Sequence, residues 1–215
     1  MSTRFDAVVF DFGGVYTDSP FDAVGGAAAD LGLSHERILE LIFGSYDEDT
    51  DHPWHKAERG EIGLEACRDE IRAHAAAVEG IDLDLYEVLR HLATGGGVRE
   101  VVIEATLGIR GRGLKTALLT NNVAEFADLW RPLLPLDEMF DAVVDSSAVG
   151  MRKPDAAIFL HTLELLGGVA PERAIFLDDF AGNVAAADAV GMTGILVEPD
   201  PTGALRRLDE LLGAP

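Results

Sequence analysis

Five short apolar runs constrain the fold of this chain more than any other feature. They are rich in β-branched residues, too short for helices and bounded by glycines or polar residues, which is typical of strands buried on both faces of a sheet. They cover residues 5–10, 114–120, 140–145, 174–178 and 193–197. Patterns with helical spacing lie between them, at residues 98–109, 123–134, 154–166 and 184–190. Strands that alternate with helices predict an α/β fold with a Rossmann-like parallel sheet covered on both faces.

The alternation fails in one place, between residues 19 and 93, where helical patterns follow one another without a convincing strand. These patterns cover residues 21–31, 34–43 and 64–78, and Ser34 suits the N-cap of the second because its hydroxyl can accept a backbone N–H. An all-helical insert after the first strand would lie over the carboxyl ends of the parallel strands, where open α/β sheets bind ligands.

The sequence therefore predicts two units. Residues 1–17 and 95–215 form the α/β core, and residues 18–94 form a helical cap domain over it. The three consecutive glycines that begin at residue 95 are either a hinge between the two units or an ordinary loop.

Acidic residues outnumber basic ones by 38 to 17, which gives a formal net charge of −21 at pH 7. A field of this sign repels nucleic-acid phosphates and anionic lipid headgroups. We therefore expect no nucleic-acid or membrane partner, and we interpret the acidic residues as a solvated surface. The oligomeric state stays open.

Cys67 is the single cysteine, which excludes an internal disulfide and a metal site with several thiolates, and which fits a reducing compartment. Its place on the apolar stripe of the pattern at residues 64–78 predicts a small core residue rather than a nucleophile. No apolar run approaches the roughly 18 residues of a membrane span. We expect a cytoplasmic protein.

Polar side chains stand where predicted strands end, and taken singly each has an ordinary explanation. Asp11 follows the first strand and could cap a turn. Thr120, Asn121 and Asn122 stand at the end of the second strand and could cap the next helix, an explanation that is compatible with a functional role. Lys153, in the loop after the third strand, could be a solvated surface charge.

Asp178 and Asp179 are harder to explain in this way. They end the apolar fourth strand, and two adjacent carboxylates at a buried strand end repel each other unless a cation lies near them. Parallel strands end at one edge of the sheet, so we expect these carboxylates near Thr120, Asn121 and Lys153 in one crevice. A carboxylate nucleophile, a hard divalent cation and donors for phosphoryl oxygens are the groups that phosphoryl transfer needs.

Four segments in chain order resemble motifs one to four of the haloacid dehalogenase superfamily: FDAVVFDFGGVYTD, ALLTNN, RKPD and IFLDDFAGNVAAADAVGM. The segment WHKAERGEIG resembles the helical cap of subfamily I, which includes the phosphatase-like N-terminal domains of soluble epoxide hydrolases. The resemblance covers essentially the whole chain. It implies a hydrolase of small phosphorylated molecules, built from an α/β core with an inserted helical cap.

The resemblance also implies a role for each residue that matches a motif. Asp11 is the nucleophile that forms an aspartyl-phosphate, and Lys153 bridges the phosphoryl group and Asp11. Thr120 and the backbone N–H of Asn121 hold phosphoryl oxygens.

Mg²⁺ is the metal that the resemblance implies. Its octahedral preference for oxygen ligands fits two carboxylates, a carbonyl, a phosphate oxygen and waters. Asp11 and Asp179 are the implied direct carboxylate ligands, together with the backbone carbonyl of Gly13. Asp178 binds through a water or supports the direct ligands.

Gly13 departs from the family pattern. Most phosphatases of this family carry a second aspartate there, which protonates the leaving group and activates water, and such acid–base catalysis is typically worth about 10²–10⁴-fold. Gly13 therefore puts the efficiency and the substrate range in question rather than the reaction class. Asp18, Tyr16, His52 and His55 are candidate replacement donors, against the alternative that the histidines belong to a solvated loop.

The leading hypothesis from the sequence is a Mg²⁺-dependent phosphatase of small organic phosphomonoesters. One alternative is a non-catalytic protein that keeps the phosphate and metal pocket, because Gly13 is the kind of change that such a loss would show. The other alternative is a 2-haloacid dehalogenase, because halide departs without a proton. A dehalogenase needs no Mg²⁺, however, and Asp178 and Asp179 would then place unneutralised charge beside an anionic substrate.

Overall fold

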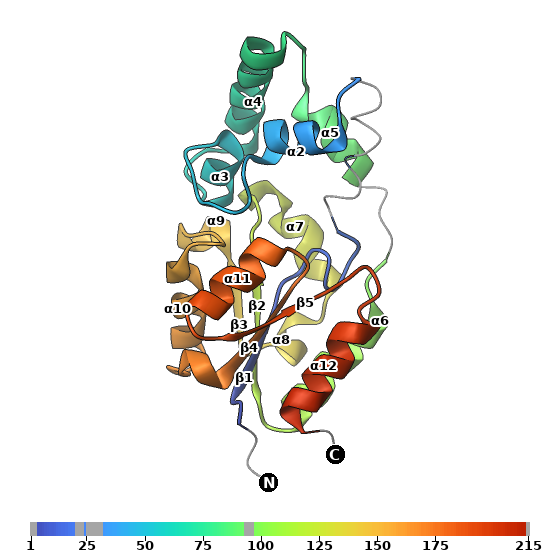
Figure 1. Cartoon of the computed structure of the whole chain (residues 1–215), viewed down its shortest axis with the longest axis vertical. Coiled ribbons are helices and arrows are strands. Elements are labelled where there is room, and N and C mark those ends of the chain that lie inside the picture. Colours follow the sequence, from blue (N-terminus) through green and yellow to red (C-terminus); the bar gives the residue numbers. More distant parts are fainter. Residues whose placement is uncertain (1–3, 20–23, 25–31, 93–96, 214–215) are drawn as a thin grey trace.

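The computed structural model of the chain describes residues 4–19, 24, 32–92 and 97–213 (Figure 1). Its centre is a five-stranded sheet in the order β3-β2-β1-β4-β5, and every neighbouring pair is parallel. The strands are β1 (Ala7–Phe10), β2 (Lys115–Thr120), β3 (Ala142–Asp145), β4 (Ala174–Asp178) and β5 (Thr193–Leu196). All five predicted strands are present, and the predicted α/β fold is confirmed.

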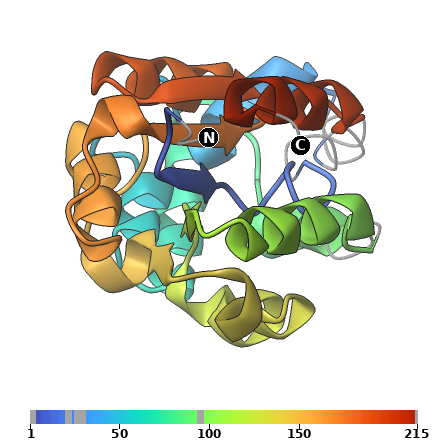
Figure 2. The same cartoon turned by 90° about the horizontal axis from the view of Figure 1, so that it is seen from below.

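Successive residues of β1 face different layers because side chains alternate along a strand. Val8 and Phe10 pack with helices α6 and α12 on one face of the sheet, whereas Ala7 and Val9 pack with α10 and α11 on the other. The bounds are α6 (Glu100–Gly111), α10 (Ala156–Leu165), α11 (Ala181–Ala189) and α12 (Thr202–Leu212). Helices thus cover both faces (Figure 2), which explains why the strands are apolar throughout.

The single helix predicted at residues 123–134 is instead three short pieces. They are the 3₁₀ turn η2 (Ala124–Phe126), the helix α7 (Ala127–Trp130) and the 3₁₀ turn η3 (Arg131–Leu133). Pro132 explains the break, because its ring removes a backbone N–H donor and crowds the preceding turn. The remaining short elements outside the insert are α8 (Leu136–Met139), α9 (Ser146–Val149) and η4 (Pro171–Arg173).

Residues 32–92 contain helices and no strand in the part that the structure describes. We call residues 32–92 the insert, and its helices are α2 (His35–Phe43), α3 (Pro53–Glu58), α4 (Leu64–Glu79) and α5 (Leu85–Leu92). The Ser34 hydroxyl accepts the N–H of Arg37 and caps α2, as predicted. The insert lies beyond the carboxyl ends of the strands (Figure 1). The predicted pattern at residues 21–31 and the glycines at 95 and 96 lie outside the described residues.

The insert has an apolar core of its own. Ile38, Trp54, Cys67 and Ile71 are buried in it, and Val123 joins them from the segment after β2. Cys67 has no exposed surface, and burial raises the pKa of its thiol to about 12. A thiol with so high a pKa carries almost no thiolate, so Cys67 is a core residue, as predicted.

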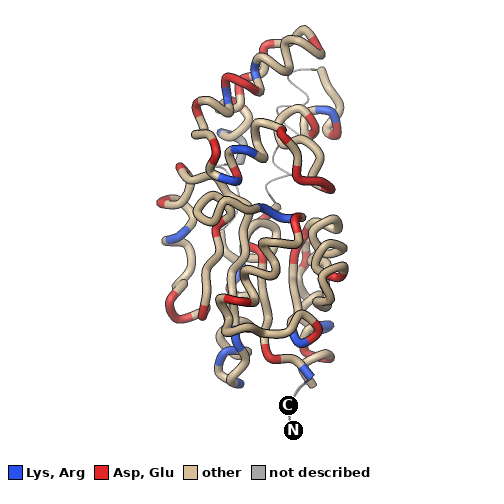
Figure 3. The backbone as a smooth tube through the Cα atoms, turned by 90° about the vertical axis from the view of Figure 1, so that its left-hand side faces the viewer, with Lys and Arg blue, Asp and Glu red and all other residues tan. Residues whose placement is uncertain are grey.

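Charged residues are spread over both the insert and the sheet-bearing part of the molecule (Figure 3). Some acidic side chains are paired at the surface, as Asp84 is with Arg68. This distribution agrees with a solvated acidic surface rather than one concentrated acidic face. Within the described residues, no helix is both long enough and apolar enough to cross a membrane.

Candidate active site

The register of the sheet brings two carboxylates to the same level. Phe10, the last residue of β1, lies opposite Leu118 of β2 and Leu177 of β4. The next residues along β1 and β4 are Asp11 and Asp178, so they leave adjacent strands at the same edge of the sheet. The parallel register therefore brings the ends of these strands together at one edge of the sheet, as the sequence predicts.

Lys153 joins these two carboxylates. Its Nζ lies 2.8 Å from Oδ1 of Asp11 and 2.7 Å from Oδ2 of Asp178. Lys153 is 1% exposed, so the alternative of a solvated lysine is wrong. Burial alone would lower the pKa of Lys153, but the Asp11 and Asp178 carboxylates outweigh burial and raise that pKa above its usual value. The buried ammonium therefore stays charged.

Three carboxylates form one cluster at this edge. Asp11, Asp178 and Asp179 each offer an oxygen, and these oxygens lie within 4.8 Å of one another. Burial raises the pKa of Asp11 well above its ordinary value, and Lys153 only partly opposes it. Burial and the neighbouring Asp178 raise the pKa of Asp179 to about 6. When all three carboxylates are ionised, the cluster holds more negative charge than Lys153 balances, and a bound cation would relieve this repulsion.

The protein treats the two adjacent aspartates differently. Asp178 accepts hydrogen bonds from the N–H of Phe180 at 2.8 Å and from Nδ2 of Asn183 at 3.1 Å to each oxygen, besides the bond from the lysine. Asp179 is half-buried and lies against the turn at Gly14. No role for Asn183 emerged from the sequence, although a lone amide in a helix of small apolar residues is a usable signal.

Asn121 ties the end of β2 to the loop that carries Lys153. Its Nδ2 donates to the Lys153 carbonyl at 2.9 Å, and its Oδ1 accepts the Lys153 N–H at 2.8 Å. Thr120 is 3% exposed, and its hydroxyl makes a long contact of 3.5 Å to the Asn121 carbonyl. The helix-cap explanation is wrong here, because the N-cap residue of η2 is Val123 and no side chain caps this turn.

Gly13 and Gly14 form the turn after β1. The N–H of Tyr16 donates to the carbonyl of Phe12 at 2.9 Å and closes this turn. Gly14 has a φ of 68°, whereas Gly13 is not among the residues with positive φ. The left-handed conformation that favours glycine thus belongs to Gly14, and the φ of Gly13 does not itself require glycine.

Two of the candidate proton donors follow this turn. Tyr16 is fully buried, and its hydroxyl bonds to Oγ1 of Thr106 at 2.7 Å. Burial raises the pKa of Tyr16 far above its usual value, so this phenol belongs to the core. The side chain of Asp18 is 65% exposed and lies 3.6 Å from Nη2 of Arg99.

The two candidate histidines lie inside the insert. His55 has no exposed surface, and its Nδ1 accepts the N–H of Thr50 at 3.0 Å, so the solvated-loop alternative is wrong for this residue. Burial lowers the pKa of His55 to about 3 and that of His52 to about 4. Imidazoles with such low pKa values are neutral near pH 7 and are poor general acids there.

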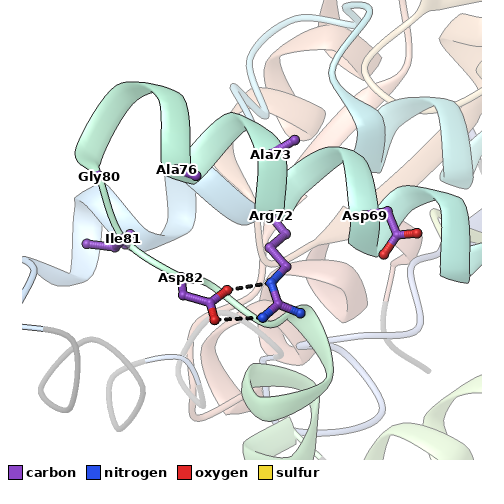
Figure 4. Close-up of a pocket in the computed structure, with 7 residues that line it drawn as sticks. All are labelled: Asp69, Arg72, Ala73, Ala76, Gly80, Ile81 and Asp82. Atoms are coloured by element: carbon purple, nitrogen blue, oxygen red, sulfur yellow. Dashed lines mark hydrogen bonds and ion pairs between the residues drawn. The ribbon is translucent and has the colours of Figure 1, made fainter.

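A surface depression lies on the insert, along the end of α4 and the turn after it (Figure 4). Its arginine, Arg72, is paired with Asp82, so the depression offers no free cation. None of its residues belongs to the motif segments. The residues that line it are Asp69, Arg72, Ala73, Ala76, Gly80, Ile81 and Asp82.

Comparison with known proteins places these residues in a family. A model of haloacid dehalogenase-like hydrolases matches residues 5–191. Acyl-CoA dehydrogenase family member 10 of Mus musculus is 32% identical over 214 residues, which are 98% of this chain but 19% of the mouse protein. This chain therefore spans about a fifth of that relative. Sesquiterpene phosphatase astK of Aspergillus oryzae is 30% identical over 217 residues, covering 99% of this chain and 100% of that protein.

A solved structure supports the same fold. A haloacid dehalogenase family enzyme from Bacteroides thetaiotaomicron, in complex with magnesium and inorganic phosphate, has a TM-score of 0.61 at 18% identity and covers 91% of this chain and 96% of its own. The family match spans every group gathered at the strand ends, from Asp11 to Asp179. This chain belongs to the haloacid dehalogenase-like hydrolases.

Proposed function

We propose that this protein is a Mg²⁺-dependent phosphatase of small organic phosphomonoesters. The observation that carries the proposal is the surroundings of Asp11: its buried carboxylate is bound by the Lys153 ammonium and clusters with Asp178 and Asp179. A nucleophilic oxygen, a fixed positive charge and an acidic pocket for a divalent cation suit phosphoryl transfer. The full-length likeness to a sesquiterpene phosphatase supports the same reaction class.

The proposed reaction has two steps. An oxygen of Asp11 attacks phosphorus, and the bond to the leaving-group oxygen breaks with its electron pair going to that oxygen. Water then attacks phosphorus of the aspartyl-phosphate and the bond between phosphorus and the Asp11 oxygen breaks, which releases inorganic phosphate and regenerates the Asp11 carboxylate. The proton that the water gives up to solvent balances the proton that the leaving oxygen takes from solvent. Lys153 lies at the attacking carboxylate and offsets the charge of the phosphoryl oxygens, which the Thr120 hydroxyl and the Asn121 backbone N–H also bind.

The acidic cluster fits Mg²⁺, because its three carboxylates, when ionised, carry more charge than Lys153 balances. In the proposed site, Asp11, Asp179 and the Gly13 carbonyl hold the ion. Asp178 instead supports Lys153, since its oxygens already accept hydrogen bonds from the protein. When bound, Mg²⁺ neutralises charge on the phosphoryl group.

The candidate proton donors from the sequence that are buried or neutral do not serve the leaving group, as far as the described residues are concerned. Gly13 has no side chain, Tyr16 is buried in the core, and His52 and His55 are neutral near pH 7. We therefore propose that the leaving oxygen departs as an anion. Esters with acidic leaving groups, such as aryl and acyl phosphates, should react fastest.

We also propose the division of the chain that the sequence predicts. Residues 1–17 and 95–215 form the core, and residues 18–94 form a cap that selects a small phosphorylated substrate. The place of the insert beyond the carboxyl ends of the strands supports this division (Figure 1). The net charge of −21 supports a protein without nucleic-acid or membrane partners, and the single cysteine fits the reducing compartment of a cytoplasmic protein.

An assay of the purified chain tests the function. Aryl, acyl and alkyl phosphates are offered with Mg²⁺ or with a chelator, and Asp11→Asn is the matched control because it keeps the shape and removes the nucleophile. We expect phosphate release that needs both Asp11 and Mg²⁺. Release of halide from 2-haloacids in the presence of chelator would instead indicate a dehalogenase. Absence of Asp11-dependent turnover of a reactive acyl phosphate would indicate a binding protein.

A further inference from the structure

Arg152, the residue before Lys153, is completely buried, and its side chain ends among groups of the insert. Nε donates to Oε2 of Glu58 at 2.7 Å, and Nη1 donates to the Glu48 carbonyl at 3.3 Å. Nη1 also lies 3.6 Å from Oδ1 of Asp49. The loop that carries Lys153 is therefore anchored on two sides, in the insert through Arg152 and at the end of β2 through the bonds between Lys153 and Asn121.

Glu58, at the end of α3, is held by hydrogen bonds in the orientation that pairs it with the Arg152 guanidinium. It is 1% exposed, and its second oxygen, Oε1, accepts Nε1 of Trp54 at 2.8 Å and the hydroxyl of Tyr46 at 2.7 Å. Removing one partner of a buried ion pair leaves the other charge uncompensated in surroundings of low polarity. The pairing of Glu58 with Arg152 therefore constrains both side chains strongly.

Tyr46 links Arg152 to the second loop of the site, the one that follows β4 and contains Phe180. Its ring centroid lies 5.2 Å from Cζ of Arg152 and 5.5 Å from the ring centroid of Phe180. Phe180 in turn donates its N–H to Oδ1 of Asp178. The insert thus contacts the neighbours in sequence of both Lys153 and Asp179.

Two other contacts join the insert to the sheet-bearing part without Arg152. The N–H of Leu64, at the start of α4, donates to Oε1 of Glu125 at 2.7 Å. Gly60 packs so closely on α9 that a Cβ atom there would lie 2.3 Å from the carbonyl oxygen of Ser147. Docking of the insert therefore does not depend on Arg152 alone.

We propose that Arg152 is a positioning residue that acts through Lys153. Its pair with Glu58 fixes the Lys153 loop against the site carboxylates while the insert is docked. The peptide unit between the two residues is planar, so a shift of the anchored residue also shifts the next. A displacement of 1 Å at a reacting centre can cost about 10²-fold in rate. The kinetic part of this inference rests on the proposed phosphatase function.

Glu58→Gln tests the proposal, with Glu125→Gln as the control that weakens a different contact of the insert. In Glu58→Gln we expect kcat to fall about 10–100-fold with little change in KM, because Lys153 acts on the reacting phosphoryl group. Arg152→Lys keeps the charge and should lose less than Glu58→Gln. Glu125→Gln should keep kcat near that of the wild type. Equal losses in Glu58→Gln and Glu125→Gln would overturn the positioning role.

Hydrogen exchange gives a readout that needs no turnover, so it remains valid if the phosphatase function is wrong. The Lys153 N–H donates to Oδ1 of Asn121. Its hydrogen-exchange rate should be higher in Glu58→Gln than in wild type, and in Glu125→Gln it should equal the wild-type rate. Wild-type exchange at Lys153 in folded Glu58→Gln would overturn the proposal. If that variant does not fold, Tyr46→Phe removes one hydrogen bond to Glu58, and unchanged exchange at Lys153 there would overturn the proposal equally.

Discussion

A Cβ atom on Gly14 would lie 2.0 Å from Cγ of Asp179. The turn after β1 therefore passes so close to the second aspartate after β4 that a hydrogen atom is the largest substituent that fits. Gly14 also has a φ of 68°, which other residues rarely adopt. Two independent constraints thus place glycine beside the proposed metal ligand.

Gly14→Ala should weaken Mg²⁺ binding, because the new methyl group must displace the Asp179 carboxylate. Gly80→Ala is a matched control, since Gly80 has a φ of 69° with nothing within 4 Å of the added Cβ. Both variants should lose about 1–2 kcal/mol of stability from the left-handed backbone. Calorimetric titration should show weaker Mg²⁺ binding in Gly14→Ala alone. Equal Mg²⁺ affinity in the two variants would contradict this placement of Asp179.

Asp178 and Asp179 should differ in what their removal costs. Asp178→Ala leaves the Asn183 amide and the Phe180 N–H without their acceptor and leaves Lys153 with Asp11 alone, and each unsatisfied buried donor costs about 1–3 kcal/mol. Asp179→Ala relieves repulsion and removes a proposed ligand, so it should abolish tight Mg²⁺ binding without loss of stability.

Urea unfolding and calorimetry on the two alanine variants separate these effects. Wild-type Mg²⁺ affinity in Asp179→Ala would remove the metal assignment, whatever the stability of the variant. A fully stable Asp178→Ala would show that the buried hydrogen bonds to this carboxylate contribute little.

The strands were predictable because strands that are buried on both faces of a sheet appear in the sequence as short, continuous apolar runs. Each run can be recognised without knowing which strand pairs with it. The prediction of one helix at residues 123–134 was wrong because it followed the helical spacing of the apolar residues and disregarded Pro132, which interrupts a helix. The strand order was not predictable, since nothing local to β1 specifies that it pairs with both β2 and β4.

Much of the candidate site was predictable for a related reason. Asp11, Thr120 and Asp178 stand directly at strand ends, so a parallel sheet brings them to one edge without further information. The Arg152–Glu58 pair was missed because the two residues are far apart in sequence, and the burial of these charges is visible only once the insert is docked. Asn183 lies only five residues after its partner Asp178, and the lone amide in its helix was a local signal that the prediction did not use.

Protonation of His55 should lower stability as the pH falls from neutral, whereas the raised pKa values of Asp11 and Asp179 act in the opposite direction. The pKa of His55 is lowered from 6.5 to about 3 by burial. Between these values the unfolded chain binds a proton that the folded chain does not, so unfolding becomes more favourable as the pH falls. Near pH 5 this should amount to about 1–2 kcal/mol relative to neutral pH.

Urea unfolding of His55→Asn at several pH values measures this effect. The variant should show a shallower loss of stability with falling pH than the wild type, whatever its stability at neutral pH. His35→Asn changes an exposed histidine at the start of α2 and should keep the wild-type slope. Identical slopes in His55→Asn and wild type would contradict the buried, neutral state of His55.

Gly13→Asp should restore the proton donor that the proposed mechanism lacks. The backbone at Gly13 has no positive φ, so an aspartate there is not strained in the way that Gly14→Ala would be. Wild type should cleave aryl and acyl phosphates far faster than alkyl phosphates, because an alkoxide leaves poorly without a proton. The new carboxyl should raise alkyl phosphate turnover by up to about 10²–10⁴-fold and should change aryl turnover much less.

Gly13→Asn separates proton transfer from shape, because the amide has nearly the same size as the carboxyl group and cannot act as a general acid near neutral pH. It should leave the wild-type preference for acidic leaving groups in place. Rates for alkyl phosphates that rise equally in Gly13→Asp and Gly13→Asn would point to a packing effect in the turn. Comparable rates for aryl and alkyl phosphates in the wild type would mean that another group, such as the exposed Asp18, already supplies the proton.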